Sequence, residues 1–338
     1  MTVIIDGTSG ITYPSTTVQN TAYQTRFKNR FINGNMVIAQ RANSATVTAG
    51  TAVPTASTGY PAVDRWFVYS TGANVTAAQV AGSNNTQNNY QITGAASVTA
   101  VGVGQRIENN NSYDLAGQTV TLSVNMSNSL LTNVTWTASY ANTSNTFGTI
   151  GTPTKVQIST GTFVVNSTLS QYSTQISLPS NATTGVEILF TVGAQTSGTW
   201  VIGNAQLEVG SAASSFEIVN YSDQLFMCQR YYETYALSST SLVGVSTSTT
   251  VAATVLTFKV TKRTAPTITL PAAGQTSGTV TFLTSIGDYP AATGTNTAAS
   301  ITVDKATING SGYTGLTSGS TSLFFSSSTS TIQINAEL

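Results

Sequence analysis

Apolar and polar residues alternate with a period of two along much of the chain. In residues 119–126, polar residues separate Val120, Leu122, Val124 and Met126. This period places one face of a strand on a core and the other in solvent. Further runs in the first 210 residues, rich in β-branched and aromatic residues, are 65–70, 134–140, 163–165, 186–192 and 199–209. Together these runs predict an all-β fold that starts with an antiparallel, jelly-roll-like β-sandwich at residues 31–220.

A second series of short strand-like runs follows residue 235. Its members are bounded by Gly, Ser, Asn and Pro, which favour turns. They are residues 256–260, 267–270, 279–283, 300–303, 322–325 and 331–335. The series predicts a smaller C-terminal β-domain at residues 236–338. No convincing repeat of 20 to 50 residues is visible, which disfavours solenoids, propellers and parallel β-helices.

The chain begins with short apolar runs around a turn signal, Asp6-Gly7, and a proline, Pro14. This pattern is typical of hairpins, but it has too few apolar residues to form a core of its own. Residues 1–30 are therefore expected to need a partner chain.

A short helix is predicted at residues 221–235, between the two β-domains. Asp223 in its first turn suits the positive end of the helix dipole. Leu225, Cys228 and Tyr232 have the spacing of one helix face and are expected to pack inward at the domain junction. Cys228 is either a small buried hydrophobe or a reactive thiol, and the buried interpretation is favoured because the chain has no histidine to act as its base.

Charge is scarce in this chain. Only 7% of residues are charged, 12 Lys and Arg balance 12 Asp and Glu, and histidine is absent. A neutral chain lacks the basic stripe that nucleic-acid binding usually requires. The absence of histidine removes the usual general base, and no two acids are placed together by sequence as glycoside hydrolysis needs. We therefore expect no enzymatic activity, no cofactor or metal and no nucleic-acid partner.

A lone cysteine excludes a disulfide bond within the chain. No apolar run reaches the roughly 18 to 20 residues that span a bilayer, and the first ten residues lack the pattern of a signal peptide. We expect synthesis in a cytoplasm and no membrane insertion.

Four charged residues stand beside apolar runs in three distant segments: Arg41, Asp64, Arg65 and Glu208. They could form a ligand-binding cluster or a partly buried ion-pair network that fixes how the sandwich closes. The ion-pair interpretation is favoured because a buried charge costs several kcal/mol unless it is paired.

Aromatic residues offer candidates for sugar contacts, because aromatic rings bury large area on a ligand. Tyr60, Trp66, Trp136 and Trp200 could form a sugar platform, but the three tryptophans lie in strand-like runs and are assigned to packing. Tyr289 and Tyr313 are surrounded by small residues typical of loops, so they are predicted as ligand-binding candidates in the C-terminal domain.

Several segments resemble the receptor-binding ends of tailed-bacteriophage fibres. They include an opening Asn-Gly-Asn segment, an Asp-Arg-Trp segment and a long stretch that leads into the predicted helix. These segments are NRFINGNMVIAQR at 29–41, GYPAVDRWFV at 59–68, GNAQLEVGSAASSFEIVNYSDQLFMCQRYYE at 203–233, FKVTKRTAPTITL at 258–270 and NAEL at 335–338. The N-terminal IDGTSGITYP is similar to segments near the bases of such fibres, particularly those of cyanobacterial phages.

The resemblance implies a homotrimeric virion fibre or spike, attached to another virion protein through residues 1–30. It also implies that the sandwich is similar to a carbohydrate-binding module and that the distal domain meets a host polysaccharide or lipopolysaccharide. The alternative is a purely structural role on the same particle, as a capsid decoration, head fibre or tail adaptor.

Overall fold

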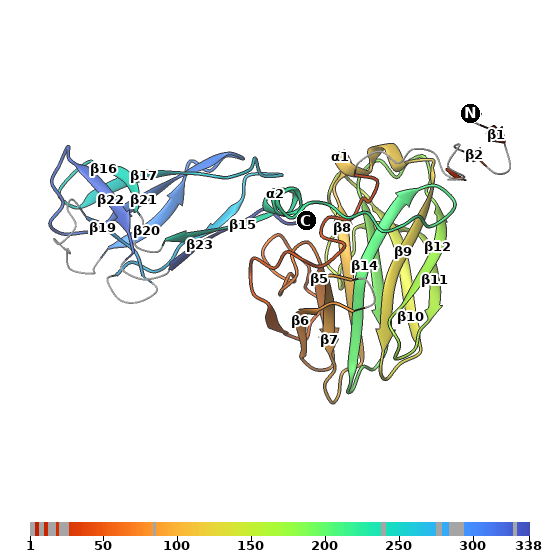
Figure 1. The fold of residues 1–338 in the computed structure, drawn as a ribbon. Helices are drawn as coiled ribbons and strands as arrows, with labels where there is room; N and C mark the ends of the chain where they lie inside the picture. The colour runs from red at the N-terminus through yellow and green to blue at the C-terminus, as the bar shows by residue number, and fades with distance from the viewer. Residues whose placement is uncertain are drawn as a thin grey trace.

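Two β-domains stand side by side, and the short helix α2 (Tyr221–Gln229) lies between them (Figure 1). The computed structural model describes residues 4–6, 10–12, 18–19, 27–83, 86–237, 241–274, 279–283, 294–326 and 330–338. Within these ranges strands predominate over helices, and every pairing of two named strands is antiparallel. The predicted all-β class is confirmed.

The first domain is a sandwich of two sheets. One sheet has the order β11 (Lys155–Val164), β10 (Asn133–Ala141), β13 (Val186–Val192), β8 (Ala100–Ile107), β5 (Phe67–Thr71). The other has the order β12 (Ser170–Ser177), β9 (Thr119–Asn128), β14 (Thr199–Val209), β7 (Asn88–Thr93), β6 (Val75–Ala81), β4 (Ser44–Val47). The chain crosses repeatedly between the sheets, as in jelly-roll folds. Between β8 and β9 it forms α1 (Asn109–Ser112) and a 3-10 turn (Tyr113–Leu115).

Apolar side chains from both sheets form one core. All four apolar residues of the alternating run in β9 are fully buried, from Val120 to Met126. Trp66 and Trp200 are also fully buried and Trp136 nearly so, which confirms the assignment of the three tryptophans to packing. Tyr60 is buried as well. The polar residues Thr121 and Ser123, on the other face of β9, are buried too. The prediction of a wet outer face is therefore wrong for this strand, since Thr121 donates its hydroxyl to the main-chain oxygen of Gly210 in the segment that follows β14.

Two glycines of β8 make room for aromatic rings of the neighbouring strand. Gly102 pairs with Tyr69 and Gly104 with Phe67. A Cβ atom on Gly102 would lie 2.0 Å from the Tyr69 ring, and one on Gly104 would lie 2.5 Å from the Phe67 ring. Only glycine allows the rings to lie this close to the backbone of β8.

The Asn-Gly-Asn segment serves the fold of the sandwich. The side-chain amide of Asn33 donates to the main-chain oxygens of Ile38 and Asp64, and its oxygen accepts from the amide of Ile38. The amide of Ala205 in turn donates to the main-chain oxygen of Gly34 over 2.9 Å. A Cβ atom on Gly34 would lie 2.2 Å from the main-chain oxygen of Ala205, so only glycine fits there. This motif therefore fixes the entry of the chain into the sandwich.

Three short strands form a small separate sheet near the N-terminus: β1 (Ile4–Asp6), β2 (Gly10–Thr12) and β3 (Val18–Gln19). The remaining residues up to 26 lie outside the described residues. The roles predicted for residues 1–30, attachment to a particle and trimerisation, stay predictions.

The helix between the domains is shorter than predicted. It ends at Gln229, and Tyr232 is the first residue of strand β15 (Tyr232–Leu237), so the prediction of a helix to residue 235 is wrong. The buried residues of α2 are Gln224, Cys228 and Gln229, whereas Leu225 is only partly buried. Of the three residues predicted to share one inward helix face, only Cys228 is buried on α2. Pairing of β15 with β23 over six residues overrides the helical spacing of Tyr232.

The distal domain contains a three-stranded and a six-stranded sheet. The first has the order β15, β23 (Ser330–Asn335), β18 (Thr267–Thr269). The second has the order β19 (Thr281–Leu283), β22 (Thr321–Phe325), β16 (Ser241–Ser246), β17 (Val251–Thr257), β21 (Lys305–Ser311), β20 (Thr295–Ala299). Their facing side chains form a second core around Phe282, Phe324 and Ile332. Residues 300–303 form the turn between β20 and β21 rather than the predicted strand, and the strand predicted at 256–260 ends at Thr257.

Candidate functional site

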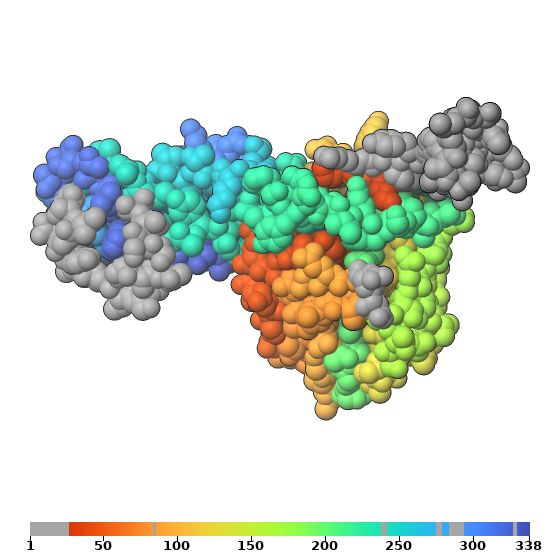
Figure 2. Space-filling view, viewed as in Figure 1, coloured from red at the N-terminus to blue at the C-terminus, as the bar shows by residue number. Residues whose placement is uncertain are grey.

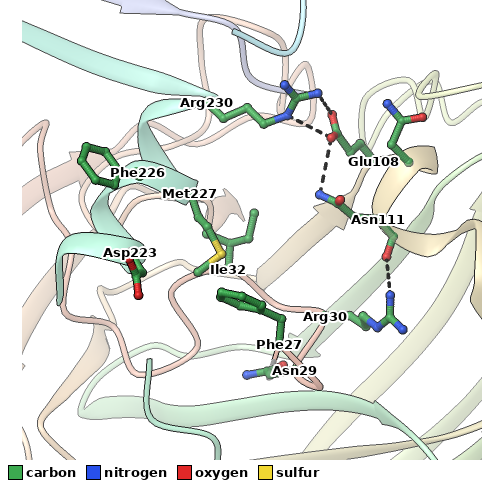
Figure 3. A pocket seen from close by; sticks show the side chains of 11 residues that line it. Phe27, Asn29, Arg30, Ile32, Glu108, Asn111, Asp223, Phe226, Met227 and Arg230 are labelled. Carbon is green, nitrogen blue, oxygen red and sulfur yellow. Dashed lines mark hydrogen bonds and ion pairs between the residues drawn. The ribbon is translucent and has the colours of Figure 1, made fainter. Parts of the chain in front are cut away.

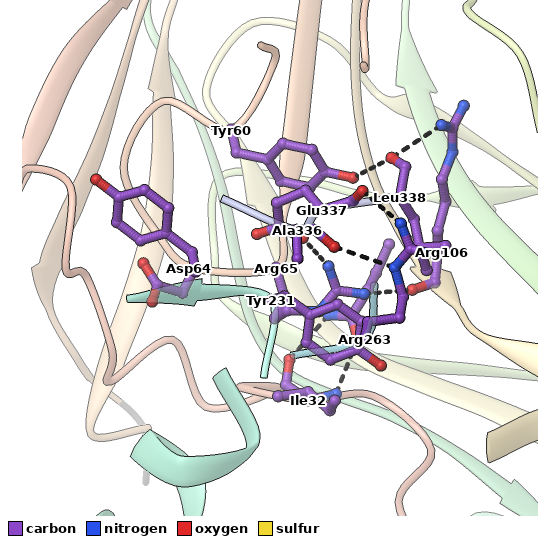
Figure 4. A network of polar contacts seen from close by, with 12 residues as sticks. Ile32, Tyr60, Asp64, Arg65, Arg106, Tyr231, Arg263, Ala336, Glu337 and Leu338 are labelled. Atoms are coloured by element: carbon purple, nitrogen blue, oxygen red, sulfur yellow. Dashed lines mark hydrogen bonds and ion pairs between the residues drawn. The ribbon is translucent and has the colours of Figure 1, made fainter. Parts of the chain in front are cut away.

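The last residues of the chain return to the first sandwich and take part in a buried network of charges (Figure 4). Glu337 is fully buried and pairs with Arg65 and, over 3.4 Å, with Arg41. The main-chain oxygen of Leu338 accepts hydrogen bonds from the hydroxyl of Tyr60 at 2.7 Å and from Arg106 at 3.0 Å. The network therefore joins the two domains through residues that lie more than 200 positions apart in the sequence.

Three of the four predicted ion-pair residues meet in this network. Asp64 lies 3.8 Å from Arg41 and accepts two hydrogen bonds from Gln40. Arg65 lies between Glu337 and the main-chain oxygen of Arg106. Burial raises the pKa of Asp64 to about 6, although Arg41 and Gln40 lower it. The network holds the distal domain in place, a wider role than the predicted closure of the sandwich.

Glu208 lies apart from these residues. Its carboxylate accepts hydrogen bonds from the main-chain amide and the hydroxyl of Ser214, and Lys28 lies 3.9 Å away. It therefore fixes the segment after β14 and the chain near residue 28. The expectation that Glu208 shares one cluster with Arg41, Asp64 and Arg65 is wrong, because β14 presents it to a different segment.

Tyrosines at the start of the distal domain cover the guanidinium groups. The guanidinium carbon of Arg41 lies 3.5 Å from the ring centre of Tyr232, and that of Arg65 lies 3.6 Å from the ring centre of Tyr231. Such stacking stabilises a buried cation. Tyr232 thus packs at the domain junction as predicted, although it does so from a strand.

Cys228 is fully buried beneath this network. Burial and the nearby carboxylate of Asp64 raise the pKa of its thiol well above the ordinary value. A thiol that stays protonated is a poor nucleophile. The interpretation of Cys228 as a small buried hydrophobe is confirmed.

Of the two tyrosines predicted for ligand contact, the structure describes only Tyr313. Tyr289 lies outside the described residues. Tyr313 is fully buried, its hydroxyl donates to Asn296 at 2.7 Å, and its ring packs edge-on against Phe282. The prediction for Tyr313 is wrong because its small neighbours, Gly294 and Gly310, make room for the ring inside the core.

An open groove of about 590 Å³ lies where α2 meets the end of the sandwich (Figures 2 and 3). We call it the α2 groove. It is lined by residues of the segment before β4, of α1 and of α2: Phe27, Asn29, Arg30, Ile32, Glu108, Asn110, Asn111, Asp223, Phe226, Met227 and Arg230. Pockets that bind small ligands have volumes of this order and combine apolar walls with a few polar groups.

Ion pairs fix the polar side of the α2 groove. Arg230 binds Glu108 with two contacts of 3.0 and 3.3 Å, and Arg30 binds Asp114 with two of 2.9 and 2.6 Å. Asn111 lies between them, and its main-chain oxygen accepts from Arg30 at 3.3 Å (Figure 3). The cations are therefore held in fixed orientations by carboxylates, which leaves no unbalanced positive charge for an anionic polymer.

Two phenylalanines form the apolar side of the groove. Phe27 and Phe226 are 52% and 53% exposed, unusually high for phenylalanine. Met227 and Ile32 lie near Phe27 in the middle of the view (Figure 3). Exposed rings beside fixed amide and guanidinium groups can stack on the C–H face of a sugar and bind its hydroxyls.

A second hollow of about 590 Å³ lies at the seam between the domains. It is lined by the β4–β5 connection, by Tyr232 and by Gln333 and Asn335 of β23. Its aromatic rings, Tyr60 and Tyr232, are buried and contact Arg41. It offers fewer exposed ring faces than the α2 groove.

The α2 groove was not predicted from the sequence, because its walls come from three distant segments. A signal was present, since Asn29, Arg30 and Ile32 belong to the segment at 29–41, and Asp223, Phe226, Met227 and Arg230 belong to the one at 203–233. Glu108 precedes α1 and Asn111 lies in it. The residue types of this segment did not indicate that it would lie beside the other two.

Among the described residues there is no cluster of three or more His, Cys, Asp and Glu that could bind a metal ion. The helices in the described ranges are also too short or too polar to cross a bilayer.

Comparison with known proteins gives only distant structural likeness. No family model matches the sequence, and no curated protein matches it. A family 4 carbohydrate-binding module has 13% identity and a TM-score of 0.36, with 53% of this chain and 98% of that chain covered. A family 11 carbohydrate-binding module from Clostridium thermocellum, in complex with a mixed-linked tetrasaccharide, has 12% identity and a TM-score of 0.29, with 51% and 98% covered.

A third similar structure is the enzymatically active domain of tailspike protein 4 from bacteriophage CBA120. It has 16% identity and a TM-score of 0.32, and the match covers 47% of this chain but only 21% of that chain. At these scores the likeness identifies neither a family nor a function.

Proposed function

We propose that this chain is a non-enzymatic attachment protein of a bacteriophage particle that binds a host surface glycan through the α2 groove. In this proposal it forms a short fibre or spike, assembles as a homotrimer and meets another virion protein through residues 1–30. Linking several such grooves in one particle raises avidity without new contacts, which suits a weak individual site.

One observation carries the proposal. Two of the segments that resemble phage fibres, 29–41 and the more specific 203–233, line the α2 groove. The groove is lined by the exposed ring of Phe226 and by amide and guanidinium groups that are already held in position. This combination suits an uncharged or weakly charged sugar.

The proposal that the chain is not an enzyme is supported by the contacts of Glu108. Arg230 donates to both of its carboxyl oxygens, whereas a glycosidase needs a pair of carboxyl groups that can reach the two sides of the glycosidic bond. Incubation with host polysaccharide is expected to release no reducing ends, and release would overturn this part of the proposal.

A glycan array tests the binding proposal. The labelled protein is expected to bind a set of surface glycans, and Phe226→Ala is expected to weaken binding at least tenfold by removing the exposed ring. Tyr221→Ala is the matched control, because Tyr221 is an exposed aromatic residue of the same helix that does not line the groove. Absence of any bound glycan, or equal binding by Phe226→Ala, would contradict the proposal.

A further inference from the structure

The outer face of the six-stranded distal sheet carries a patch of valines. Val243 and Val245 of β16 and Val255 of β17 are 68%, 53% and 53% exposed. We call these three residues the valine face. Burial alternates along β17, with Ala252, Thr254 and Leu256 turned to the core, so Val255 points away from it. The exposed valines are thus not part of the distal core.

The three valines are neighbours on the sheet. Strand β16 pairs with β17 so that Gly244 lies opposite Thr254 and Val245 opposite Ala253. One step further in the same register brings Val243 opposite Val255. On the other side of β16, Val243 lies opposite Leu323 of β22, which is only partly buried. Directly opposed side chains lie about 5 Å apart, so these residues form one continuous apolar surface.

Polar residues bound this surface on the side of β21 and β20. The outward positions of β21 are Lys305, Thr307, Asn309 and Ser311, and those of β20 include Thr295 and Thr297. An apolar centre with a polar rim is the anatomy of a protein interface. Isolated exposed valines are common and need no explanation, but contiguous ones on one sheet face indicate a partner.

Charge indicates which partner fits. Val243, Val245, Val255 and Leu323 are uncharged, and the described charged residue nearest to them along the paired strands is Lys305, at the end of β21. A charged partner would lose water from its charges here and find no counter-charge. A second copy of this chain supplies an equally neutral valine face, and a closed rotation axis brings the same residues together.

The size of the sheet sets the strength of this contact. The whole outer face of six strands, about 4.8 Å apart and roughly five residues long, covers roughly 500 Å² with its polar rim. This area is below the roughly 800 Å² per partner of a standard stable interface. Association through the valine face alone is therefore expected to be reversible.

We infer that the valine face packs against another copy of this chain in solution. The inference rests on the self-association included in the proposed function and assigns its surface, independently of the α2 groove. It commits to a homo-oligomer centred on Val243, Val245 and Val255.

Sedimentation velocity over about 1 to 100 μM tests this inference on the whole chain. The wild type is expected to form oligomers with rising concentration, and Val243→Asp is expected to weaken association at least tenfold, because it buries a charge without a partner. The matched control is Val164→Asp, since Val164 is 72% exposed on β11 of the first domain. It is expected to associate like the wild type.

A monomeric wild type over the whole range would overturn the inference, as would equal association of wild type and Val243→Asp. Circular dichroism checks folding, and Val243→Thr with Val245→Thr replaces Val243→Asp if that variant does not fold. Glycan binding by the dissociated variant is measured separately. Loss of assembly with intact glycan binding supports both proposals, whereas wild-type assembly without glycan binding contradicts only the proposed groove.

Discussion

At the scale of single residues, the ion pair of Arg65 with Glu337 gives these two charged side chains a structural role in a chain with few charges. Both are buried, and each is the other's main charge partner. Arg65 adopts a positive φ of 73°, a conformation that costs free energy for any residue other than glycine. The ion pair and the stacking on Tyr231 stabilise this strained position.

Glu337→Gln is expected to lower the free energy of unfolding by about 3 to 5 kcal/mol, because it leaves the buried guanidinium of Arg65 without its carboxylate, whereas Arg41 keeps Asp64. Urea unfolding measures the loss. Asp114→Asn is the control, since it removes an exposed ion pair with Arg30 and should cost less than about 1 kcal/mol. Equal effects of the two variants would contradict a buried network.

Asp64 makes the stability depend on pH. Its pKa rises from an ordinary value of 3.8 to about 6, which corresponds to about 3 kcal/mol. Because the folded protein holds this proton more tightly than the unfolded chain, the contribution is fully present below about pH 4. It is lost as pH rises through 6.

Asp64→Asn removes this titration. Relative to the variant, the wild type is expected to lose about 3 kcal/mol of stability between pH 4 and pH 7, measured by urea unfolding at several pH values. The difference between the two proteins cancels the titration of other groups. A difference that stays constant over this range would show that Asp64 keeps an ordinary pKa.

At the scale of elements, several long strands could be predicted from alternation and from runs of β-branched and aromatic residues, whereas most of β11 and all of β12 could not. The runs predicted at 186–192 and 199–209 are β13 and β14 with the same bounds. Strands such as β8, AVGVGQRI, gave no such signal. Its outward glycines are explained only by the rings of Tyr69 and Phe67 on β5. Those rings belong to a distant segment, so no local pattern could reveal the strand.

Gly102→Ala is expected to destabilise the protein by about 1 to 3 kcal/mol, because the added methyl group would displace the Tyr69 ring 2.0 Å away. Gly193→Ala serves as the control, since no atom lies within 4 Å of a Cβ there. Thermal unfolding of both variants distinguishes them. A loss no larger for Gly102 than for Gly193 would mean that β5 and β8 are not packed in this way.

At the scale of the whole molecule, the C-terminal residues join the domains. Arg263 of the distal domain donates to the main-chain oxygens of Ala336 and Glu337, and the amide of Ala336 donates to the main-chain oxygen of Tyr231. The resemblance at 335–338 marked this segment, but its location against the first sandwich depends on the complete fold. The same holds for the α2 groove, whose walls come together only in three dimensions.

The joined domains are expected to unfold in one calorimetric transition. Arg263→Ala removes the two hydrogen bonds that hold the main chain of Ala336 and Glu337 on the distal domain. It is expected to weaken the coupling of the domains and to split this transition into two. Two transitions in the wild type would show that the network does not couple the domains.

Glycan binding in the α2 groove underlies the proposed function, and a crystal structure with the tightest-binding glycan from the array would show it. A sugar ring is expected against Phe226, with its hydroxyls within hydrogen-bond distance of Asn111 or Arg230. A sugar bound instead at the seam near Tyr232 and Gln333, or on an outer sheet face, would contradict it.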